Sequence, residues 1–246
     1  MAYVRVFDNE TQVAGAAAVI IASAILHKPN VILGLATGST PIPTYRELIR
    51  LYQNGVLDFS RVITFNLDEY CHLPAEHACS YHYFMRKHLF ENINISAGNT
   101  HLPNGNAPDL AKEGIRYDMA IETAGGIDLQ LLGIGRNGHI GFNEPAEQFT
   151  YESHVADLTP STMEANSRFF EEEDMPFQAI SMGIGSIMSA KEILLIATGM
   201  DKAEAIRKSL QGDIRPQIQA SILRTHPKAV YLLDQAAASQ LDCSKA

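Results

Sequence analysis

An aspartate and a glutamate stand side by side directly after an apolar run, in Asn66-Leu67-Asp68-Glu69-Tyr70. A carboxylate at the end of a buried strand can serve as a general base or as a metal ligand. It can equally be an ordinary turn acid, and this pattern alone does not decide between the roles. Cys71, His72, His77 and Cys79 follow, but they lack the paired-cysteine spacing of a zinc site, so we expect no metal here.

A glycine-rich segment runs from Gly133 to Pro145 and contains Asn137, His139 and Glu144. Its glycines permit positive φ angles and a close approach of the backbone to a ligand. A histidine near a carboxylate can be oriented as an acid/base group that works near neutral pH. The glycine spacing resembles a dinucleotide-binding fingerprint, but no capped helix pattern follows it. The alternative is a glycine-rich loop with a structural histidine.

A third segment, Thr37-Gly38-Ser39-Thr40-Pro41, lies between an apolar run and a helical pattern. Gly38 allows backbone N–H groups to turn inward, and Ser39 and Thr40 add hydroxyl donors. A helix N-terminus adds positive potential, so the segment is suited to binding an anion such as phosphate. No lysine follows the glycine, so it is not a Walker A loop. The alternative is an ordinary strand-to-helix turn capped by Thr40.

Two cations, Arg168 and Lys202, are candidates to complete such an anion site. An arginine can bind phosphate through two parallel hydrogen bonds, and a lysine adds a point charge. Either could instead be a solvated surface charge. The whole chain has 19 basic and 28 acidic residues, a formal net charge of −9. This charge argues against binding nucleic acid or a membrane surface, but a few local cations suffice for one phosphate.

The elements that must position these loops alternate along the chain. Asn9 and Ser80 are candidate helix caps, and Gly125-Gly126 ends another helix. Strands alternating with helices are typical of βαβ units and predict a mainly parallel sheet with helices on both faces. The expected strands are 3–7, 31–36, 62–66, 129–133, 192–197 and 229–233, and the expected helices are 10–27, 41–52, 81–90, 108–123 and 201–210.

In such sheets, ligands bind outside the carboxyl ends of the strands. We therefore expect the loops after 31–36, 62–66, 129–133 and 192–197 to meet in one site. Residues 146–157 and the acidic stretch 171–174 are candidate mobile loops.

Composition limits the class of protein. With 246 residues, of which 46% are apolar, the chain forms one globular domain or at most two. Three cysteines are an odd number and favour a reducing compartment. We find no apolar run of the roughly 18 residues that a membrane helix needs, and no signal peptide. The expectation is a soluble, cytoplasmic protein that binds neither membrane nor nucleic acid.

Taken together, the motifs resemble the glucosamine-6-phosphate deaminase family, also called glucosamine-6-phosphate isomerases. No single loop is decisive, but the motifs occur in the family's order over most of the chain. They are GLATGSTP (34–41), FNLDEY (65–70), SYHYFM (80–85), LPNGNAPD (102–109), LLGIGRNGHIGFNEP (131–145), NSRFF (166–170) and THPKA (225–229).

The resemblance implies a three-layer α/β/α domain, which we place at 1–241, followed by a tail at 242–246. It implies that D-glucosamine 6-phosphate and water are converted to D-fructose 6-phosphate and ammonia in amino sugar catabolism, with no metal or organic cofactor. By the same resemblance, Asp68 transfers the proton between C2 and C1, and His139 acts in ring opening. Glu144 and Asn137 orient that histidine. Gly38, Ser39, Thr40, Arg168 and Lys202 bind the phosphate.

Two departures from the family pattern affect these expectations. Position 137 is Asp in some members and Asn here, so we expect Asn137 to accept a hydrogen bond from His139, and Glu144 to supply the negative charge. Members activated by N-acetylglucosamine 6-phosphate are hexamers with basic residues after the NEP motif, whereas 146–156 contains no Arg or Lys here. We therefore expect no such activation, and a monomer or small homo-oligomer.

Three other functions would share parts of this pattern. A 6-phosphogluconolactonase on a related fold would share the phosphate loop and the histidine loop, but it does not need the base in FNLDEY. A non-catalytic sugar-phosphate sensor would need a helix-turn-helix module, for which the chain has no spare length. A dinucleotide-dependent oxidoreductase would need an acidic residue that is missing after the first glycine turn.

Overall fold

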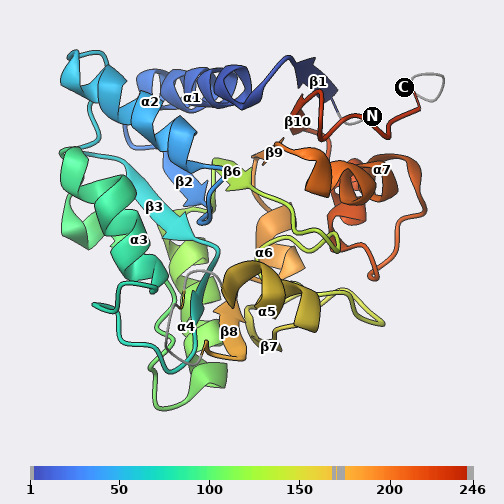
Figure 1. The fold of residues 1–246 in the computed structure, drawn as a ribbon. Helices are drawn as coiled ribbons and strands as arrows, with labels where there is room; N and C mark the ends of the chain where they lie inside the picture. The colour runs from blue at the N-terminus through green and yellow to red at the C-terminus, as the bar shows by residue number, and fades with distance from the viewer. Residues whose placement is uncertain (1–2, 168–169, 171–174, 243–246) are drawn as a thin grey trace.

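The computed structural model describes residues 3–167, 170 and 175–242, and its centre is a seven-stranded sheet (Figure 1). The strand order is β1-β10-β9-β6-β2-β3-β5, and every neighbouring pair is parallel. The expected parallel sheet is thereby confirmed. The strands are β1 (Tyr3–Phe7), β2 (Ile32–Leu35), β3 (Ile63–Asn66), β5 (Thr100–His101), β6 (Leu129–Leu132), β9 (Glu192–Ala197) and β10 (Ala229–Asp234).

Helices cover both faces of this sheet. Right-handed crossovers between parallel strands place α1, α2 and α3 on one face and α4, α6 and α7 on the other. Figure 1 shows α1 and α2 on the opposite side of the sheet from α4 and α6, which makes the expected three layers. The α-helices are α1 (Glu10–His27), α2 (Ile42–Gln53), α3 (Tyr81–His88), α4 (Leu110–Ala124), α5 (Pro160–Ser167), α6 (Ile184–Met188) and α7 (Ala203–Gln211). The short 3₁₀ helices are η1 (Phe90–Asn92), η2 (Ala97–Asn99), η3 (Met200–Lys202) and η4 (Gln219–Thr225).

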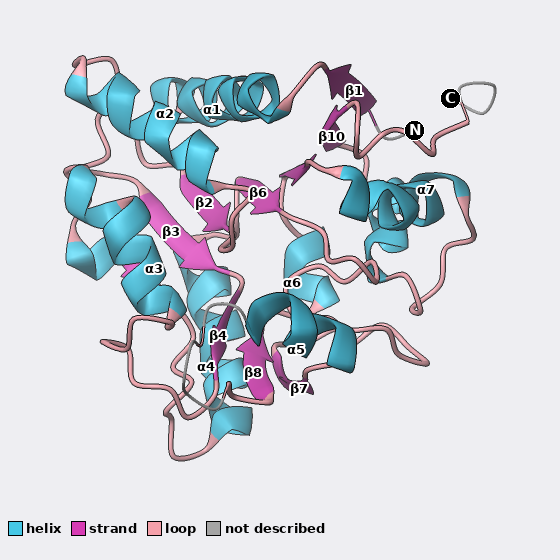
Figure 2. Cartoon of the chain, viewed as in Figure 1, coloured by secondary structure: helices cyan, strands magenta, loops and turns pink. Residues whose placement is uncertain are grey.

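A second, three-stranded antiparallel sheet was not predicted. Its order is β4 (Asp68–Tyr70), β8 (Gln178–Ser181) and β7 (His154–Asp157), and it lies beyond the end of β3 (Figure 2). The expectation of a loop throughout 146–157 is wrong for its last four residues, which form β7. The acidic stretch 171–174 lies outside the described residues.

Local sequence explains the main elements. All four residues of β2 are buried, as their unbroken apolar run predicts for a central strand. The Asn9 side chain caps α1 by accepting a hydrogen bond from the Gln12 N–H, and Ser80 caps α3 in the same way, both as expected. Helix α4 ends at Gly125, whose φ of 102° is readily available to glycine.

Helix α1 is long and apolar enough to cross a membrane by length and composition alone. In the fold it packs against α2 and β10. Val13, Ala17 and Ile21 are at most 1% exposed. Burial in the core therefore accounts for the apolar residues on one face of the helix, whereas Val19 and Leu26 are exposed.

The chain order creates a crevice between β2 and β6. From β2 the chain continues to β3 on one side, whereas from β6 it continues to β9 on the other. Helices that leave in opposite directions separate the loops above these two strands, and ligands bind at such switch points. The threonine-glycine loop follows β2 and the glycine-rich loop follows β6, so both border this crevice.

Candidate active site

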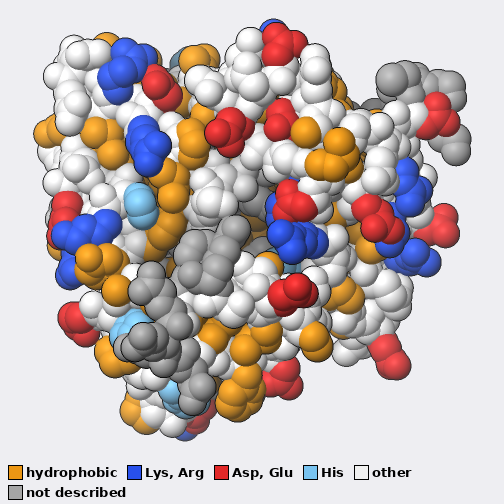
Figure 3. Space-filling model, viewed as in Figure 1, with side chains coloured by type: hydrophobic (Ala, Val, Ile, Leu, Met, Phe, Trp, Pro, Cys, Tyr) orange, Lys and Arg blue, Asp and Glu red, His pale blue; other side chains and the backbone are white. Residues whose placement is uncertain are grey.

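The crevice holds a cavity of about 450 Å³. Its lining includes residues from each of the four loops expected to meet, among them Ser39, Asp68, His139 and Thr198. Figure 3 shows a hollow near the middle of this face, with basic and acidic side chains next to each other at its rim. The carboxyl ends of β2, β3, β6 and β9 thus converge on one site.

Asp68 lies in the cavity wall and is only 6% exposed. Strand β4 begins at Asp68, one residue after β3 ends, and Asp68 pairs with Ser181 of β8. No described residue donates a hydrogen bond to its carboxylate. Burial, and secondly the charge of Glu69, raise its pKa to about 8. Only the ionised form can accept a proton; its share increases as pH rises towards 8, and it is a stronger base than an ordinary aspartate.

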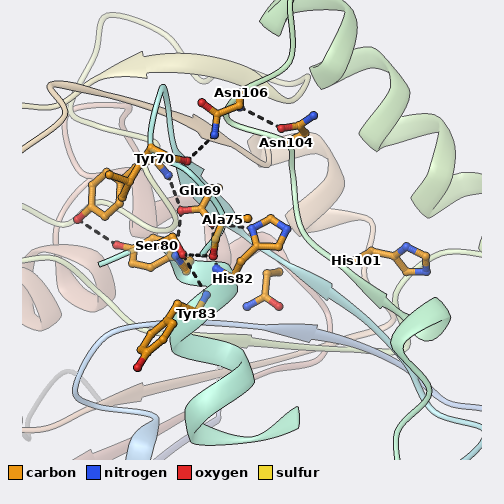
Figure 4. Close-up of polar contacts among 12 residues, drawn as sticks. Glu69, Tyr70, Ala75, Ser80, His82, Tyr83, His101, Asn104 and Asn106 are labelled. Carbon is orange, nitrogen blue, oxygen red and sulfur yellow. Dashed lines mark hydrogen bonds and ion pairs between the residues drawn. The ribbon is translucent and has the colours of Figure 1, made fainter. Parts of the chain in front are cut away.

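Glu69 occupies a different environment from Asp68, because neighbouring side chains on a strand point to opposite faces. Its carboxylate is buried and accepts hydrogen bonds from the backbone N–H groups of Tyr70, Tyr81 and His82, each at 2.9 Å. Nδ1 of His82 lies 2.7 Å from Oε2 of Glu69. Figure 4 shows Glu69 directed at the start of α3. Glu69 therefore anchors the helix, which leaves Asp68 as the acid that faces the cavity.

His139 belongs to the glycine-rich loop after β6, and it also lines the cavity. A Cβ atom on Gly135 would lie 2.2 Å from Cε1 of the His139 ring, so a glycine is required at this position. The His139 side chain is 18% exposed, and its Nδ1 lies 3.5 Å from Oε2 of Glu144. The ring edge opposite Nδ1 carries Nε2. The loop therefore holds the imidazole against a carboxylate through one nitrogen.

Glu144 and Asn137 lie behind His139. Burial of Glu144 opposes its ionisation, but the hydrogen bond and charge of His139, together with bonds from Thr162 and Asn137, lower the Glu144 pKa to about 2. Asn137 Nδ2 donates to Glu144 Oε2 at 2.7 Å, and Asn137 Oδ1 accepts from the backbone N–H of His139 at 3.2 Å. Asn137 therefore accepts a hydrogen bond from His139, as expected, but from its backbone N–H and not from its ring, so Asn137 does not hold the tautomer directly; Glu144, which Asn137 holds, faces the ring.

The threonine-glycine loop forms the other end of the cavity, from Thr37 to Pro41. Gly38 has a φ of 94°, a value that glycine adopts without strain. Helix α2 begins with Pro41 at its N-cap and has no side-chain cap, so Thr40 does not serve as one. Backbone and hydroxyl donors at a helix N-terminus make this end suitable for an anion.

Lys202 also lines the cavity, and its Nζ lies 3.6 Å from Oδ2 of Asp201. Arg168, the other predicted cation, lies outside the described residues. Sequence reasoning missed Arg136, which also lines the cavity and donates from Nε to Asp201 Oδ2 at 3.0 Å. The position of Arg136 within the glycine-rich segment was the feature of the sequence that could have identified it. Arg136 and Lys202 therefore bring two positive charges to the cavity wall, where the carboxylate of Asp201 partly offsets them.

Sequence reasoning also missed α5, which supplies Thr162, Ala165 and Asn166 to the cavity wall. Tyr81 at the start of α3 is a further lining residue. Among the residues that the structure describes, no group of three or more His, Cys, Asp or Glu side chains is placed to hold a metal ion.

Comparison with known proteins places this fold and site in a family. Residues 8–232 match the family described as glucosamine-6-phosphate isomerases/6-phosphogluconolactonase. A glucosamine-6-phosphate deaminase of Clostridioides difficile is 54% identical over 92% of this chain and 91% of its own length. A solved structure of a monomeric glucosamine-6-phosphate deaminase is 44% identical, with a TM-score of 0.95 over 97% of this chain and 100% of the other.

A more distant solved structure shares the fold alone. The 6-phosphogluconolactonase of Leishmania guyanensis is 20% identical, with a TM-score of 0.76 over 99% of this chain and 100% of the other. The family match covers nearly the whole described sheet, the cavity and all four loops that line it. The chain therefore belongs to the glucosamine-6-phosphate isomerase/6-phosphogluconolactonase family.

Proposed function

We propose that the protein converts D-glucosamine 6-phosphate and water to D-fructose 6-phosphate and ammonia, as a soluble cytoplasmic enzyme of amino sugar catabolism. The observation that carries the proposal is the shared cavity, which brings the proton acceptor Asp68, the histidine His139 and an anion-binding loop together. Relatives about half identical to this chain carry the name of this enzyme. Lactone hydrolysis removes no proton from carbon, so it does not need a second carboxylate base placed in the cavity as Asp68 is.

The phosphate end of the substrate is assigned to the loop at Gly38, Ser39 and Thr40, with Lys202 and Arg168 as its cations. Arg136, which lines the same cavity, is a further candidate cation for the phosphate. Binding the phosphate holds the sugar in one orientation while its other end reacts, which lowers the entropic part of the barrier.

His139 opens the pyranose ring in this mechanism. Its Nε2 accepts the proton of the C1 hydroxyl and returns it to the ring oxygen, so the bond between C1 and that oxygen breaks and an aldehyde forms. Histidine is suited to both transfers because its proton affinity lies near neutral pH. Glu144 stabilises the imidazolium that forms during the first transfer, since its carboxylate stays ionised with a pKa of about 2.

Asp68 then moves the proton that defines the isomerisation. The aldehyde acidifies the hydrogen on C2, Asp68 removes it, and the resulting enediol-like intermediate accepts a proton at C1. Carbon 2 becomes an imine, water adds to it, and ammonia leaves to give the ketone. A positioned base of this kind contributes roughly 10²- to 10⁴-fold in rate.

The test is ammonia release from glucosamine 6-phosphate, measured for the parent, Asp68→Asn and the surface control Asp58→Asn. Fructose 6-phosphate and ammonia from the parent and the control, and neither from Asp68→Asn, are expected. A folded parent that releases no ammonia would reject the proposal, and 6-phosphogluconolactone would be the next substrate.

One of the relatives also bears on the oligomeric state that we propose. We infer a monomer or small homo-oligomer without activation by N-acetylglucosamine 6-phosphate. Support comes from the solved relative described as monomeric and from the absence of Arg and Lys in 146–156.

A further inference from the structure

A hydrogen-bond network that the mechanism above does not use lies between His139 and helix α5. Thr162 Oγ1 is 3.3 Å from Nδ1 of His139. Thr159 Oγ1 donates to Glu144 Oε2 at 3.1 Å and lies 3.2 Å from Thr162 Oγ1. Asn137 Nδ2 reaches Thr159 Oγ1 at 3.2 Å. Two threonines at the start of one helix thus contact both the imidazole and its carboxylate.

The network is concentrated on one oxygen of Glu144. Oε2 faces Asn137, Thr159 and His139, whereas Oε1 is buried and has no hydrogen-bond partner among the described residues. Because Oε1 has no donor, a hydrogen bond lost at Oε2 is not compensated elsewhere on the carboxylate. An ionised carboxylate in a buried site needs its donors, because desolvation is otherwise uncompensated.

The directions of these bonds decide the tautomer of His139. Asn137 has two amide hydrogens, which serve Glu144 Oε2 and Thr159 Oγ1, and the Thr159 hydroxyl hydrogen serves Glu144. Glu144 is an ionised carboxylate that only accepts, and its Oε2 faces Nδ1 of His139 at 3.5 Å, so Nδ1 carries the hydrogen and Thr162 Oγ1, 3.3 Å away, serves as its second acceptor. A ring nitrogen with two acceptors carries the hydrogen, which leaves Nε2 with a free electron pair.

We propose that Thr159 and Thr162 are positioning residues for His139, because they hold its ring in the Nδ1-protonated tautomer that presents Nε2 to the substrate. The kinetic part of this inference rests on the proposed function. Thr162 is buried, at 3% exposed, yet it belongs to α5, which also lines the cavity through Ala165 and Asn166. The same helix therefore joins the shape of the substrate pocket to the orientation of the proton carrier.

The first test is the tautomer itself, read from ¹⁵N NMR of histidine-labelled protein with His139→Gln to assign the signal. We expect the parent, Thr162→Ser and the exposed control Thr225→Val to show the Nδ1-protonated form. Thr162→Val and Thr159→Val, which keep the side-chain shape and lose the hydroxyl, are expected to show a mixture of tautomers. An unchanged tautomer in both valine variants would overturn the proposal. If one of the two variants does not fold, the tautomer of the other tests the proposal alone.

The second test is the kinetics of ammonia release. We expect Thr162→Val to lower kcat about tenfold, the equivalent of one hydrogen bond, with a smaller change in KM. Thr162→Ser should recover kcat to within about threefold of the parent. Equal loss in the serine and valine variants would assign the effect to packing and reject the positioning role. A parent without deaminase activity would reject the proposed function, while the NMR result would still decide the tautomer.

Discussion

Replacement of Asp68 by Asn should abolish ammonia release and at the same time stabilise the fold, by an amount that increases with pH. Burial, and secondly the charge of Glu69, raise the Asp68 pKa from 3.8 to about 8. In the unfolded chain the Asp68 carboxyl loses its proton near pH 3.8, whereas in the folded protein it keeps the proton until the pH approaches 8. The stability that this group contributes is therefore complete below about pH 4 and is lost as pH rises towards 8.

The size of the effect follows from the slope of this linkage. Each pH unit between the two pKa values costs the parent up to about 1.4 kcal/mol, and the Asn variant nothing, because an amide does not ionise. Between about pH 5 and pH 7.5 the variant should gain about 3 kcal/mol relative to the parent. Because Asp68 is 6% exposed, solvent screens little of this difference.

The assay is thermal or urea unfolding of parent and Asp68→Asn at about pH 5 and about pH 7.5. For a chain of this length, about 3 kcal/mol corresponds to roughly 10 °C in Tm. Asp58→Asn is the matched control, because the pKa of that exposed carboxyl is lowered, chiefly by the Ser60 N–H. The difference between this control and the parent should not grow over the same pH interval. A stability difference between Asp68→Asn and parent that is the same at both pH values would refute the reasoning.

Four further outcomes are expected. Glu144→Gln should lower kcat roughly 10- to 100-fold, and Asn137→Ala less; a nearly active Glu144→Gln beside an inactive Asn137→Ala would reverse the assigned roles. Gly135→Ala should cost roughly 100-fold in kcat, since its Cβ would displace the His139 ring, and ammonia release with a thermal melt separates this from unfolding. Arg136→Gln should raise KM about tenfold at low salt, and an unchanged KM would remove Arg136 from the phosphate end. Substrate saturation should be hyperbolic, and sigmoidal curves relieved by N-acetylglucosamine 6-phosphate would contradict the regulatory inference.

The sequence by itself determined the elements whose stability is local. Continuous apolar runs predicted the buried central strands, because a strand covered on both faces has no polar side. Asn9 and Ser80 marked helix starts, since their side chains satisfy the first free N–H groups. The loops that follow these strands carried Asp68 and His139, so the chemistry was visible before any geometry.

Only the tertiary structure decided which of two adjacent acids faces the cavity. Asp68 and Glu69 are equivalent by spacing, and the raised pKa of Asp68 arises from burial between segments far apart in the chain. The small sheet was not predicted because β4 (DEY), β7 (HVAD) and β8 (QAIS) lack the continuous apolar run that marked the equally short β2 and β6. Their pairing is long-range, as in Asp68 with Ser181.

Long-range contact also explains why the residues that contact the site residues were not predicted. Arg136 meets Asp201 across 65 positions, and Thr162 meets the His139 ring across 23. The predicted hydrogen bond from His139 to Asn137 comes from the backbone N–H and not from the ring, because the loop directs the Asn137 amide toward Glu144. Residue types along a chain show which groups can exchange protons or bind phosphate, whereas burial and contact, which decide their proton affinity and orientation, exist only once the chain is folded.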